Sequence, residues 1–409
     1  MAHKGDDVKN SSRRILTTHV GSLIRPPELQ NFLRAKQGGK PYDQAAYLKC
    51  LKDSVAMVVK QQALAGVDIV SDGEFGKAIS WAQYALERLS GFERRPFSGT
   101  SPFARGADRS RFAEFYAELD AKEGAATVSE SVVVGPIRYT GQAALKQDIE
   151  DFKAALKGVN VEEGFLPVAA VSSVIPDKKN EFYKTDDELQ IAVAEAMRTE
   201  YKTIVDSGFL VQLDDARAAV TYDRMVPPKS FKEYRKWLER QIEIMNHSLE
   251  GIPQDRVRYH VCWGSWPGPH TTDVPLADII DIILKAKVGA FVIEGANPRH
   301  EHEWKVWGGV NLKGRLLISG VISHATNVVE HPELVAERIV RLAKEVGREN
   351  VIAGTDCGFA QGPFYRRVHP SIMWAKLEAL AAGAKIASKQ LWAAKAKAKP
   401  KASKKRKRA

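Results

Sequence analysis

Short apolar runs alternate with longer amphipathic stretches along most of this sequence. The runs lie at residues 15–21, 67–71, 165–171, 209–213, 257–262, 290–294, 316–322 and 351–355. Apolar runs of this length, bounded by polar and turn residues, are typical of buried strands. Stretches with apolar residues at helical spacing follow most of them, at residues 42–66, 187–207, 230–249, 276–287, 332–346 and 370–382. This alternation predicts a parallel sheet covered by helices.

Eight such strands in a chain of this length favour a (β/α)8 barrel, with a doubly wound open sheet as the alternative. We expect a single catalytic domain at residues 15–387, preceded by a disordered N-terminus at 1–14. A further strand-like run at 131–139 predicts a hairpin within an insertion at about 92–141, between the second and third barrel strands. Residues 96–111 are rich in Pro, Gly, Ser and charge, which predicts a surface loop with some helix.

The formal net charge of +11 over 409 residues suggests a nucleic-acid-binding protein until the charge is located. Of the 61 basic residues, ten lie at 388–409, where there is no Asp or Glu. The other 51 are balanced by 50 acidic residues, so the rest of the chain is nearly neutral. Low complexity and dense positive charge predict a disordered basic tail at 388–409.

The cellular compartment is predicted from features that the sequence lacks. Three cysteines in 409 residues argue against a disulfide framework and fit a reducing environment. The first residues are polar and have no apolar core of a signal peptide, and no stretch approaches the roughly 18–20 apolar residues of a membrane span. We therefore expect a cytoplasmic protein.

Two of the three cysteines belong to a set of residues that suits a metal ion. His260 and Cys262 are two positions apart on a predicted strand, so they point to the same side of it. Glu294 follows Cys262 by 32 residues, and Cys357 comes 63 residues later. Imidazole, carboxylate and thiolate are ligands that zinc favours. Ligands that arrive singly from successive strand ends, rather than in close pairs, predict a reaction site and not a zinc finger.

The barrel prediction places these residues at one end of the molecule, because active sites of such barrels lie at the C-terminal ends of the strands. Taken singly, each residue has a simpler explanation. A buried cysteine packs as a small hydrophobe, as we expect for Cys50, and a glutamate after a strand often caps a helix. Other polar residues that follow predicted strands are Ser22, Asp72, Glu74, Asp214, Asp215 and His324.

The predicted ligand set indicates a type of chemistry. Three charged ligands leave zinc with a net charge of about −1, which makes it a poor Lewis acid for activating water. Such a centre can still bind and deprotonate a substrate thiol, and it leaves the thiolate nucleophilic. The sequence therefore favours alkyl transfer to sulfur. It contains no Walker-type phosphate loop, no Gly-x-Gly-x-x-Gly after a strand and no Gly-x-Ser-x-Gly elbow.

Residues 299–303, Arg-His-Glu-His-Glu, form a second polar cluster. It lacks the His-Glu-x-x-His spacing of a helical metal site. We consider two interpretations: a loop at the mouth of the site, in which Arg299 or a histidine (His300 or His302) holds an acidic group of the substrate, or a solvated charged loop. Trp263 and Trp266 either wall the pocket or simply pack.

Seven motifs together resemble the catalytic barrel of cobalamin-independent methionine synthase and its single-barrel relatives, over about residues 15–382. They are Thr-His-Val-Gly-Ser (18–22), Asp-Gly-Glu (72–74), Val-Gln-Leu-Asp (211–214), His-Val-Cys (260–262), Val-Ile-Glu (292–294), Gly-Val-Ile-Ser-His-Ala-Thr-Asn (320–327) and Thr-Asp-Cys-Gly (355–358). The resemblance implies that zinc is the cofactor and that its ligands are His260, Cys262, Glu294 and Cys357.

The resemblance also implies roles for the residues after other strands. Val20 and Ser22 match the family's homocysteine contacts. Glu74 and Asp214 match the carboxylates that hold the ammonium group of this substrate. His324 matches the catalytic histidine, the proton donor, with a one-residue gap just before it.

The sequence departs from the family where the alkyl donor binds. The full-length enzymes have a second, N-terminal barrel with no counterpart in this sequence. They place a tryptophan after the third barrel strand, where it stacks on the pterin of methyltetrahydrofolate, whereas residues 171–174 here read Val-Ser-Ser-Val. The family's pterin-contacting Arg-Cys pair has no match either. Relatives with the same zinc site open epoxides with coenzyme M, and others take methyl from a corrinoid.

The sequence thus predicts a zinc-dependent thiol alkyltransferase, specifically a methyltransferase that makes methionine from homocysteine, with methylfolate, a corrinoid or an epoxide as the alkyl donor. The nearest alternative is transfer to another thiol, such as coenzyme M opening an epoxide. An alternative of another class is a nucleic-acid-associated binding protein that acts through its basic tail. The neutral remainder of the chain and the complete zinc set argue against that alternative.

Overall fold

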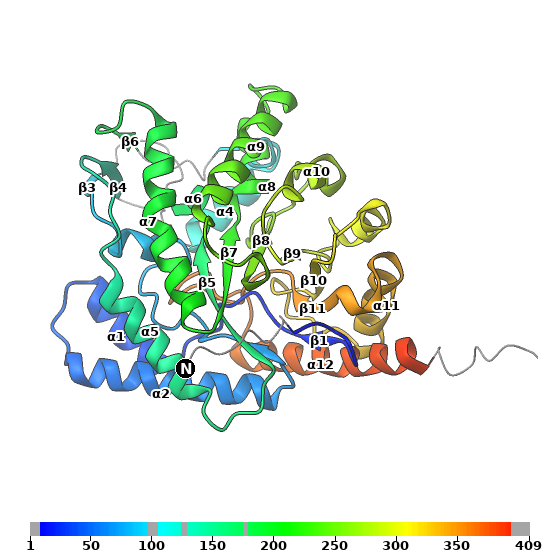
Figure 1. Ribbon diagram of the computed structural model, residues 1–409. Coiled ribbons are helices and arrows are strands. Elements are labelled where there is room, and N and C mark those ends of the chain that lie inside the picture. The colour runs from blue at the N-terminus through cyan, green and yellow to red at the C-terminus, as the bar shows by residue number, and fades with distance from the viewer. Residues whose placement is uncertain (1–8, 97–104, 124–128, 175–178, 394–409) are drawn as a thin grey trace, which may run out of the picture.

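The chain folds into a closed barrel. The computed structural model describes residues 9–96, 105–123, 129–174 and 179–393. Eight parallel strands form one sheet in the order β1-β11-β10-β9-β8-β7-β5-β2, and a parallel bridge between Thr18 and Ile69 joins its two ends. The predicted (β/α)8 barrel is therefore confirmed, and the open sheet is excluded (Figure 1).

The strands lie close to their predicted positions. The barrel is built from β1 (Leu16–Thr17), β2 (Ile69–Val70), β5 (Glu163–Ala169), β7 (Leu210–Asp215), β8 (Val257–Val261), β9 (Ala290–Ile293), β10 (Leu316–Ile322) and β11 (Val351–Thr355). Longer helices around it are α1 (Pro27–Gln37), α2 (Gln44–Leu64), α5 (Gln142–Ala155), α7 (Asp186–Asp206), α8 (Arg217–Met225), α9 (Phe231–Ser248), α11 (Pro332–Val346) and α12 (Pro370–Ala393). Shorter turns are α6 (Val171–Val174), α10 (Ile280–Ile283) and the 3₁₀ helices Gln83–Glu87, Gln254–Arg256, Leu276–Asp278, Glu301–Gly309 and Arg348–Asn350.

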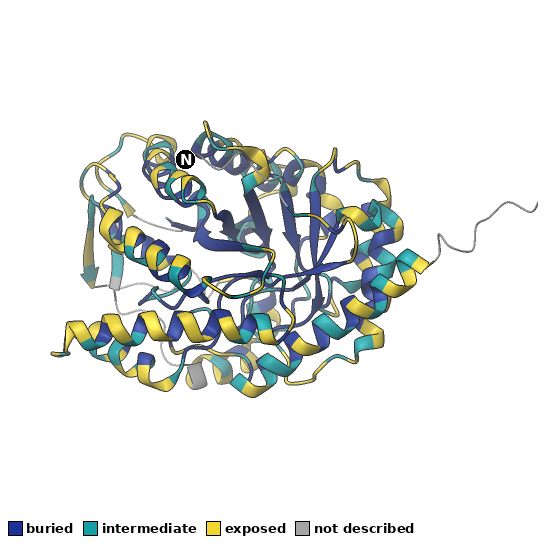
Figure 2. Cartoon of the chain, turned by 60° about the horizontal axis from the view of Figure 1, so that its bottom comes forward, coloured by how far each residue is buried: buried dark blue, intermediate teal, exposed yellow. Residues whose placement is uncertain are grey.

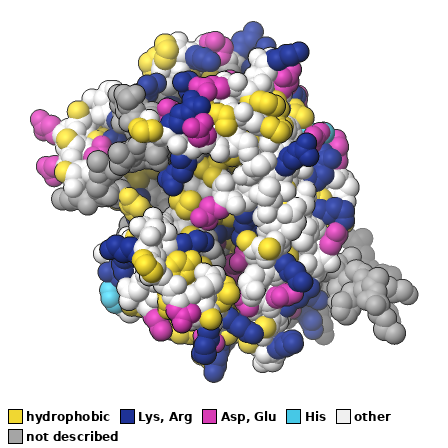
Figure 3. All heavy atoms as spheres, turned by 90° about the vertical axis from the view of Figure 1, so that its left-hand side faces the viewer, with side chains coloured by type: hydrophobic (Ala, Val, Ile, Leu, Met, Phe, Trp, Pro, Cys, Tyr) yellow, Lys and Arg dark blue, Asp and Glu magenta, His cyan; other side chains and the backbone are white. Residues whose placement is uncertain are grey.

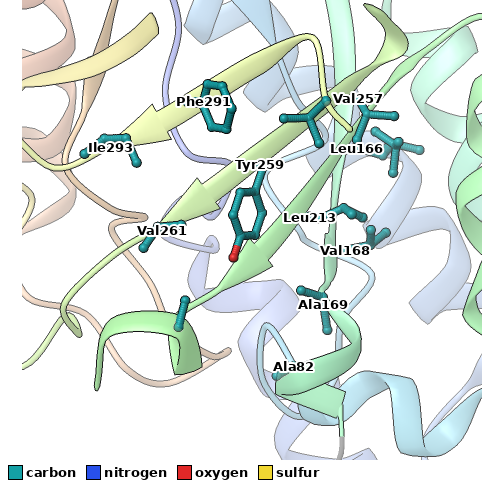
Figure 4. Close-up of a cluster of buried hydrophobic side chains, with 14 of the residues drawn as sticks. Ala82, Leu166, Val168, Ala169, Leu213, Val257, Tyr259, Val261, Phe291 and Ile293 are labelled. Carbon is teal, nitrogen blue, oxygen red and sulfur yellow. The ribbon is translucent and has the colours of Figure 1, made fainter. Parts of the chain in front are cut away.

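Alternation of side chains along each strand creates two separate cores. One buried cluster, which includes Leu210 and Val292, contains the residues that face the barrel interior. The other fills the space between strands and helices, and the strands β5, β7, β8 and β9 contribute to it in Figure 4. Asp214 is four residues from Leu210 and Glu294 is two from Val292, so both share the inward direction. Labelled side chains of the outer core in Figure 4 include Leu166, Val168, Leu213, Val257, Tyr259, Val261, Phe291 and Ile293.

The helices cover the barrel with one face and meet solvent with the other, as the burial colours of Figure 2 show. Local sequence sets where they begin. At the start of α9, the Ser230 side chain accepts a hydrogen bond from the Glu233 backbone, and the Glu233 carboxylate accepts one from the Ser230 backbone. This capping box satisfies two backbone donors that the first helical turn would otherwise leave unpaired.

Two of the predicted helices have the wrong length. The helix expected at 276–287 is a 3₁₀ turn followed by the single turn α10. This segment is dominated by buried isoleucines at positions 279–283, and β-branched residues are weak helix formers. Helix α12, predicted to end at 382, continues to Ala393, and near its end Trp392 lies 4.2 Å beneath the guanidinium of Arg348. It therefore enters the segment expected to be the tail.

Parts of both expected disordered ends lie on the barrel. In the N-terminal segment, Ser11 donates a hydrogen bond to the Val351 carbonyl at 2.5 Å, and Arg14 forms an ion pair with Asp68 at 2.6 Å. The other parts of these two predicted ends, residues 1–8 and 394–409, lie outside the described residues.

A small second sheet lies beside the barrel; two of its strands come from the insertion between β2 and β5, and the third follows β5 in the sequence. Strands β3 (Phe92–Pro96) and β4 (Ser129–Val133) pair antiparallel, and β6 (Lys179–Asn180) joins β4 in parallel. The strand expected at 131–139 thus starts earlier and ends at Val133. Helices α3 (Ala107–Arg111) and α4 (Ala113–Glu123) lie between β3 and β4 in the sequence. In the predicted loop at 96–111, residues 97–104 are outside the described ranges.

A buried ion pair ties the start of this insertion to the barrel helices. Arg88, just before β3, donates to Glu200 on α7 at 2.8 Å and also to Asp148 on α5. Tyr84 donates to the same Glu200 oxygen at 3.0 Å. The Glu200 side chain is 1% exposed, so the pair is shielded from water and salt.

We predict that Glu200→Gln lowers the free energy of unfolding by about 3–5 kcal/mol, because breaking a buried ion pair leaves its partner without compensation. Urea denaturation followed by circular dichroism measures the change. The control is Asp206→Asn on the same helix, whose exposed pair with Lys202 at 2.6 Å should contribute less than about 1 kcal/mol. Equal effects of the two changes would contradict this role for the Arg88–Glu200 pair.

Candidate active site

Three of the four expected metal ligands meet at the C-terminal end of the barrel. His260 lies on β8, Cys262 directly follows that strand, and Cys357 follows β11. One potential ligand atom from each lies within 4.8 Å of the other two. The two sulfur atoms are 4.0 Å apart, although the residues are 95 positions apart in the sequence. The barrel therefore builds one donor group from distant segments.

The hydrogen bond of His260 determines which ring nitrogen is available. Its Nδ1 lies 3.2 Å from the carbonyl oxygen of Val292, which can only accept, so Nδ1 carries the proton. Its Nε2 is buried and has no hydrogen-bond partner among the described residues. Burial is the main cause that lowers the pKa of His260 to about 3, so the ring is neutral. A neutral imidazole with an available Nε2 lone pair is a good metal ligand.

The acidic donors disfavour one another's ionised forms. The hydrogen bond with Cys357, and then burial, raise the pKa of Cys262 well above its ordinary value. Burial, and then the charge of Cys262, raise the pKa of Glu294. Buried anions at such distances ionise together readily only when a cation lies close to them. The donor set therefore suits a cation.

Glu294 lies next to the group of three but outside it. Its Oε1 accepts a hydrogen bond from the Trp263 backbone at 3.0 Å, and its Oε2 accepts one from the Asn297 side chain at 3.3 Å. These partners draw the carboxylate to the loops after β8 and β9. The structure thus brings three of the four expected ligands together and keeps the fourth beside them.

A cavity of about 490 Å³ opens beside the thiols. It collects residues from the ends of β1, β2, β7, β8 and β11, which are distant in the sequence. The residues expected to bind the substrate thus share one cavity with the candidate metal ligands. These lining residues are Val20, Ser22, Glu74, Asp214, His260, Cys262 and Cys357.

Two carboxylates lie side by side in this cavity. Glu74 has a left-handed backbone conformation with a φ of 61°, and its carboxylate is 3.5 Å from the ammonium of Lys77. Asp214 accepts a hydrogen bond from Gln212 at 2.9 Å. Burial, and then the charge of Glu74, raise the pKa of Asp214 well above its ordinary value. A second cation placed near this pair would favour ionisation of Asp214.

A glycine allows two of the motifs to meet. The Ser22 carbonyl accepts a hydrogen bond from the Phe359 backbone at 2.9 Å, and its Oγ accepts one from Ala360 at 3.4 Å. A Cβ atom added at Gly358 would lie 1.9 Å from the Ser22 Oγ. A side chain at position 358 would force the Ser22 hydroxyl to move, so the glycine of the Thr-Asp-Cys-Gly motif lets the loop after β11 lie this close to Ser22.

His324 follows β10 near the group but is not among the residues that line the cavity. Neither ring nitrogen has a hydrogen-bond partner among the described residues. Burial, and then the charge of Arg367, lower the pKa of His324 to about 3, so the ring is neutral. Its loop is fixed by Glu330, which accepts from the Ser323 backbone at 2.8 Å and pairs with buried Lys376 at 2.8 Å.

The sequence motifs missed the outer wall of the cavity. Part of it comes from the insertion, where Tyr116 accepts a hydrogen bond from Trp266 at 3.1 Å and donates one to Asp108 at 3.3 Å. Trp266 thus walls the pocket, whereas Trp263 is buried and donates to the Val274 carbonyl. The sequence feature that could have indicated this wall is the frequency of arginine at residues 105–111. The aromatic and basic residues of this wall are Trp81, Tyr116, Trp266, Tyr365, Arg105, Arg109, Arg217, Arg224 and Arg367.

The cluster at 299–303 does not line this cavity: His300, Glu301 and Glu303 line a separate pocket together with Glu294, and His300 and Glu303 are buried rather than solvated. His300 lies between Asp273 and Glu303, at 2.9 Å and 2.8 Å from their carboxylate oxygens. Arg299 donates to the His270 carbonyl at 2.9 Å, and Glu301 forms ion pairs with arginines of α11. These contacts join the loops after β8 and β9.

Charges on the visible surface are mixed. On the face in Figure 3, Lys and Arg side chains are interspersed with Asp and Glu. This distribution agrees with the near balance of basic and acidic residues outside the tail. In the described ranges, there is no helix whose length and apolar character would let it span a membrane.

No family model matches the chain, but individual relatives do. The methionine synthase of Sulfolobus acidocaldarius is 26% identical over 344 residues, covering 84% of this chain and 85% of that protein. The 2-hydroxypropyl-CoM lyase of Xanthobacter autotrophicus is 24% identical over 429 residues, covering 97% of this chain and 99% of that protein.

Solved structures share the barrel. A B12-independent methionine synthase from Shewanella sp. W3-18-1, in complex with selenomethionine, has a TM-score of 0.69 at 20% identity, over 93% of this chain and 99% of that one. A putative B12-independent methionine synthase from Listeria monocytogenes has a TM-score of 0.62 at 19% identity, over 91% and 98%. Over most of its length, this chain is thus similar in sequence to proteins named methionine synthase and 2-hydroxypropyl-CoM lyase, and it shares its fold with B12-independent methionine synthases, as its motifs predicted.

Proposed function

We propose that the chain is a zinc-dependent enzyme that transfers an alkyl group to a thiol, specifically a methyltransferase that makes methionine from homocysteine. The observation that carries the proposal is the convergence of the His260 ring with the thiols of Cys262 and Cys357 beside a cavity that Glu74 and Asp214 line. The relatives named methionine synthase support the same reaction.

The residues fit a zinc ion. Two thiols and an imidazole nitrogen with no other partner are donors that zinc favours, and we propose Glu294 as the fourth ligand. When bound, zinc supplies the positive charge that keeps a substrate thiol deprotonated and nucleophilic. The hydrogen bond from His260 Nδ1 to Val292 holds the imidazole in the orientation that this role requires.

The cavity residues would bind and orient the amino acid. Glu74 and Asp214 would hold its ammonium group, whose charge offsets the repulsion between the two carboxylates. The substrate sulfur then attacks the alkyl carbon, a sulfur–carbon bond forms, and the leaving group departs with the electrons of the broken bond. Because its ring is neutral here, His324 would take up the proton that the substrate thiol gives up and pass it to the leaving group as negative charge develops there.

A second candidate is an epoxide:coenzyme M-type transferase. Similarity to 2-hydroxypropyl-CoM lyase extends over 97% of this chain. Five arginines line the cavity, and arginine is well suited to bind a sulfonate, carboxylate or phosphate group. The outer wall therefore also suits an anionic reactant that has no ammonium group. A corrinoid as the methyl donor is a further possibility for the homocysteine reaction.

Assays with zinc-loaded protein distinguish these candidates. Homocysteine would be supplied with methylfolate or methylcobalamin, and coenzyme M with an epoxide. Formation of methionine from either methyl donor supports the first proposal and identifies the donor. Product formed only from coenzyme M and an epoxide favours the second candidate.

We predict that the purified protein holds about one tightly bound zinc per chain, and that Cys262→Ser and Cys357→Ser each lose it. Each change removes a thiolate from a buried donor group. Elemental analysis by mass spectrometry measures the metal. Glu294→Gln should weaken zinc binding if this carboxylate is the fourth ligand.

The third cysteine provides the control for this prediction. Cys50 is half-buried on α2, away from the donor group, so Cys50→Ser should retain zinc. Full zinc occupancy in both Cys262→Ser and Cys357→Ser would remove these residues from the metal site.

We predict that Asp214→Ala weakens homocysteine binding at least about a hundredfold and leaves zinc in place. Loss of one partner of a buried charged pair costs about 3–5 kcal/mol, and each 1.4 kcal/mol is tenfold in affinity. Calorimetry with wild type and variant measures the effect. Coenzyme M, which lacks the amino group, serves as the control ligand and should bind both proteins alike. Unchanged homocysteine affinity would contradict the assignment of an amino-acid substrate.

We predict that removal of residues 394–409 leaves zinc content, melting temperature and homocysteine binding unchanged. Because the tail is dense in Lys and Arg, its removal should abolish retention on heparin at low salt, where polyanion binding is strongest. Loss of homocysteine binding in the truncated chain would show that the tail contributes to the enzyme. If the full chain binds nucleic acid and the truncated chain does not, the result would favour the alternative of a nucleic-acid-binding protein.

A further inference from the structure

A second, smaller cavity lies next to the active-site cavity, between the loop after β1, helix α1 and the loop after β11. Its volume is about 280 Å³. No Asp or Glu is among its lining residues in the described ranges, although three arginines are. The residues that define it are Arg25, Gln30, Arg34, Phe364, Tyr365 and Arg366.

Arg25 is the unusual member of this group. It is only 3% exposed, and its Nη2 donates to the backbone carbonyls of Glu74 and Lys77, the latter at 3.1 Å. Its Nε and Nη1 are buried and have no hydrogen-bond partner among the described residues. A guanidinium left with unused donors inside a protein is costly unless an acceptor reaches it. The arginine therefore lacks the acceptor that its environment requires.

The other two arginines approach the same cavity from exposed positions. Arg34 is in the last turn of α1, where its guanidinium lies 5.0 Å from the ring centroid of Phe364. Within the described ranges, its hydrogen bonds go to the neutral side chains of Asn31 and Gln30, at 3.1 Å and 3.3 Å. Arg366 is exposed on the loop after β11. Positive charge thus gathers here with no acidic residue in the described lining, although the charges of Glu74 and Asp72, outside the lining, act on Arg25.

We propose that this cavity binds an oxyanion, a phosphate or carboxylate group, held by Arg25 from within and by Arg34 and Arg366 at the rim. A guanidinium offers a fork of donors that matches the oxygens of either group. The bound oxygens would satisfy the unused donors of Arg25. This inference does not rest on the proposed alkyltransferase function.

The site would also communicate with the active-site cavity through two contacts. Arg25 holds the carbonyl of Glu74, whose side chain lines the larger cavity, and Tyr365 lines both cavities. An oxyanion on Arg25 would therefore stabilise the turn at 72–74 that presents Glu74. Its source would be a free anion or the acid group of a larger ligand.

The test uses thermal unfolding of the full chain in inorganic phosphate and in malonate, each compared with chloride at equal ionic strength. A ligand that binds only the folded state raises the melting temperature. We expect a rise with at least one probe in wild type, and loss of most of that rise in Arg34→Gln and in Arg366→Gln. A larger rise with phosphate assigns a phosphate group, and a larger rise with malonate assigns a carboxylate group.

The variants are chosen to keep the fold intact. Arg25 itself supports backbone carbonyls, so the exposed Arg34 and Arg366 are changed instead. Lys36→Gln is the matched control, because Lys36 lies in the same last turn of α1 and does not line the cavity. No rise in wild type, or an equal rise in all three variants, would overturn the proposal. Zinc content and homocysteine binding should be unchanged in Arg366→Gln, which separates this site from the proposed function.

Discussion

The parallel register of the closed barrel is the constraint on which the candidate site depends. Asp214 on β7 is paired with His260 on β8, and His260 is paired with Val292 on β9. Because alternate residues face inward, the next inward positions after this layer are Cys262 and Glu294, at the ends of their strands. A shift of one residue in the register would turn all of these side chains toward the helices. The same pairing that closes the barrel therefore also assembles the donors.

A buried positive charge beneath this layer influences the groups above it. Arg258 faces inward two residues before His260 and donates to the Thr18 side chain at 3.2 Å and to the His19 carbonyl at 3.1 Å. Its guanidinium lies 3.9 Å from the ring centroid of Phe165. Burial lowers the pKa of Arg258 to about 9, and the charge of Asp214 acts in the opposite direction. Burial is the main reason that the His260 imidazole stays neutral, and this cation adds to it by disfavouring a second positive charge.

The strands and helices that the sequence predicted well are those that depend on local periodicity. Strands such as Leu316–Ile322 and helices such as Pro332–Val346 are encoded by short-range patterns and agree with prediction at both ends. The strand-end rule then placed His260, Cys262 and Cys357 in one group. Long-range partners could not be predicted this way. The pairing of β6 with β4, the contact of Trp266 with Tyr116 and the burial of His300 between two carboxylates each require knowledge of the folded chain.

The two halves of the cavity have different physical origins, and this bears on which alkyl donor the proposed enzyme would accept. The inner half comes from strand ends whose positions the barrel fixes. The outer half comes from the insertion and from loops, which vary more readily without loss of the core. Where the resembling family has an aromatic residue after the third strand, Ser173 and Val174 line this cavity, while Tyr116 and Trp266 supply aromatic surface from other elements. The chain is similar both to a methionine synthase and to 2-hydroxypropyl-CoM lyase. This agrees with a shared inner site for a thiol and an outer wall that differs between proteins. Under the proposed function, the identity of the alkyl donor would therefore depend on the arginine and aromatic residues of the outer wall, and not on the candidate metal ligands.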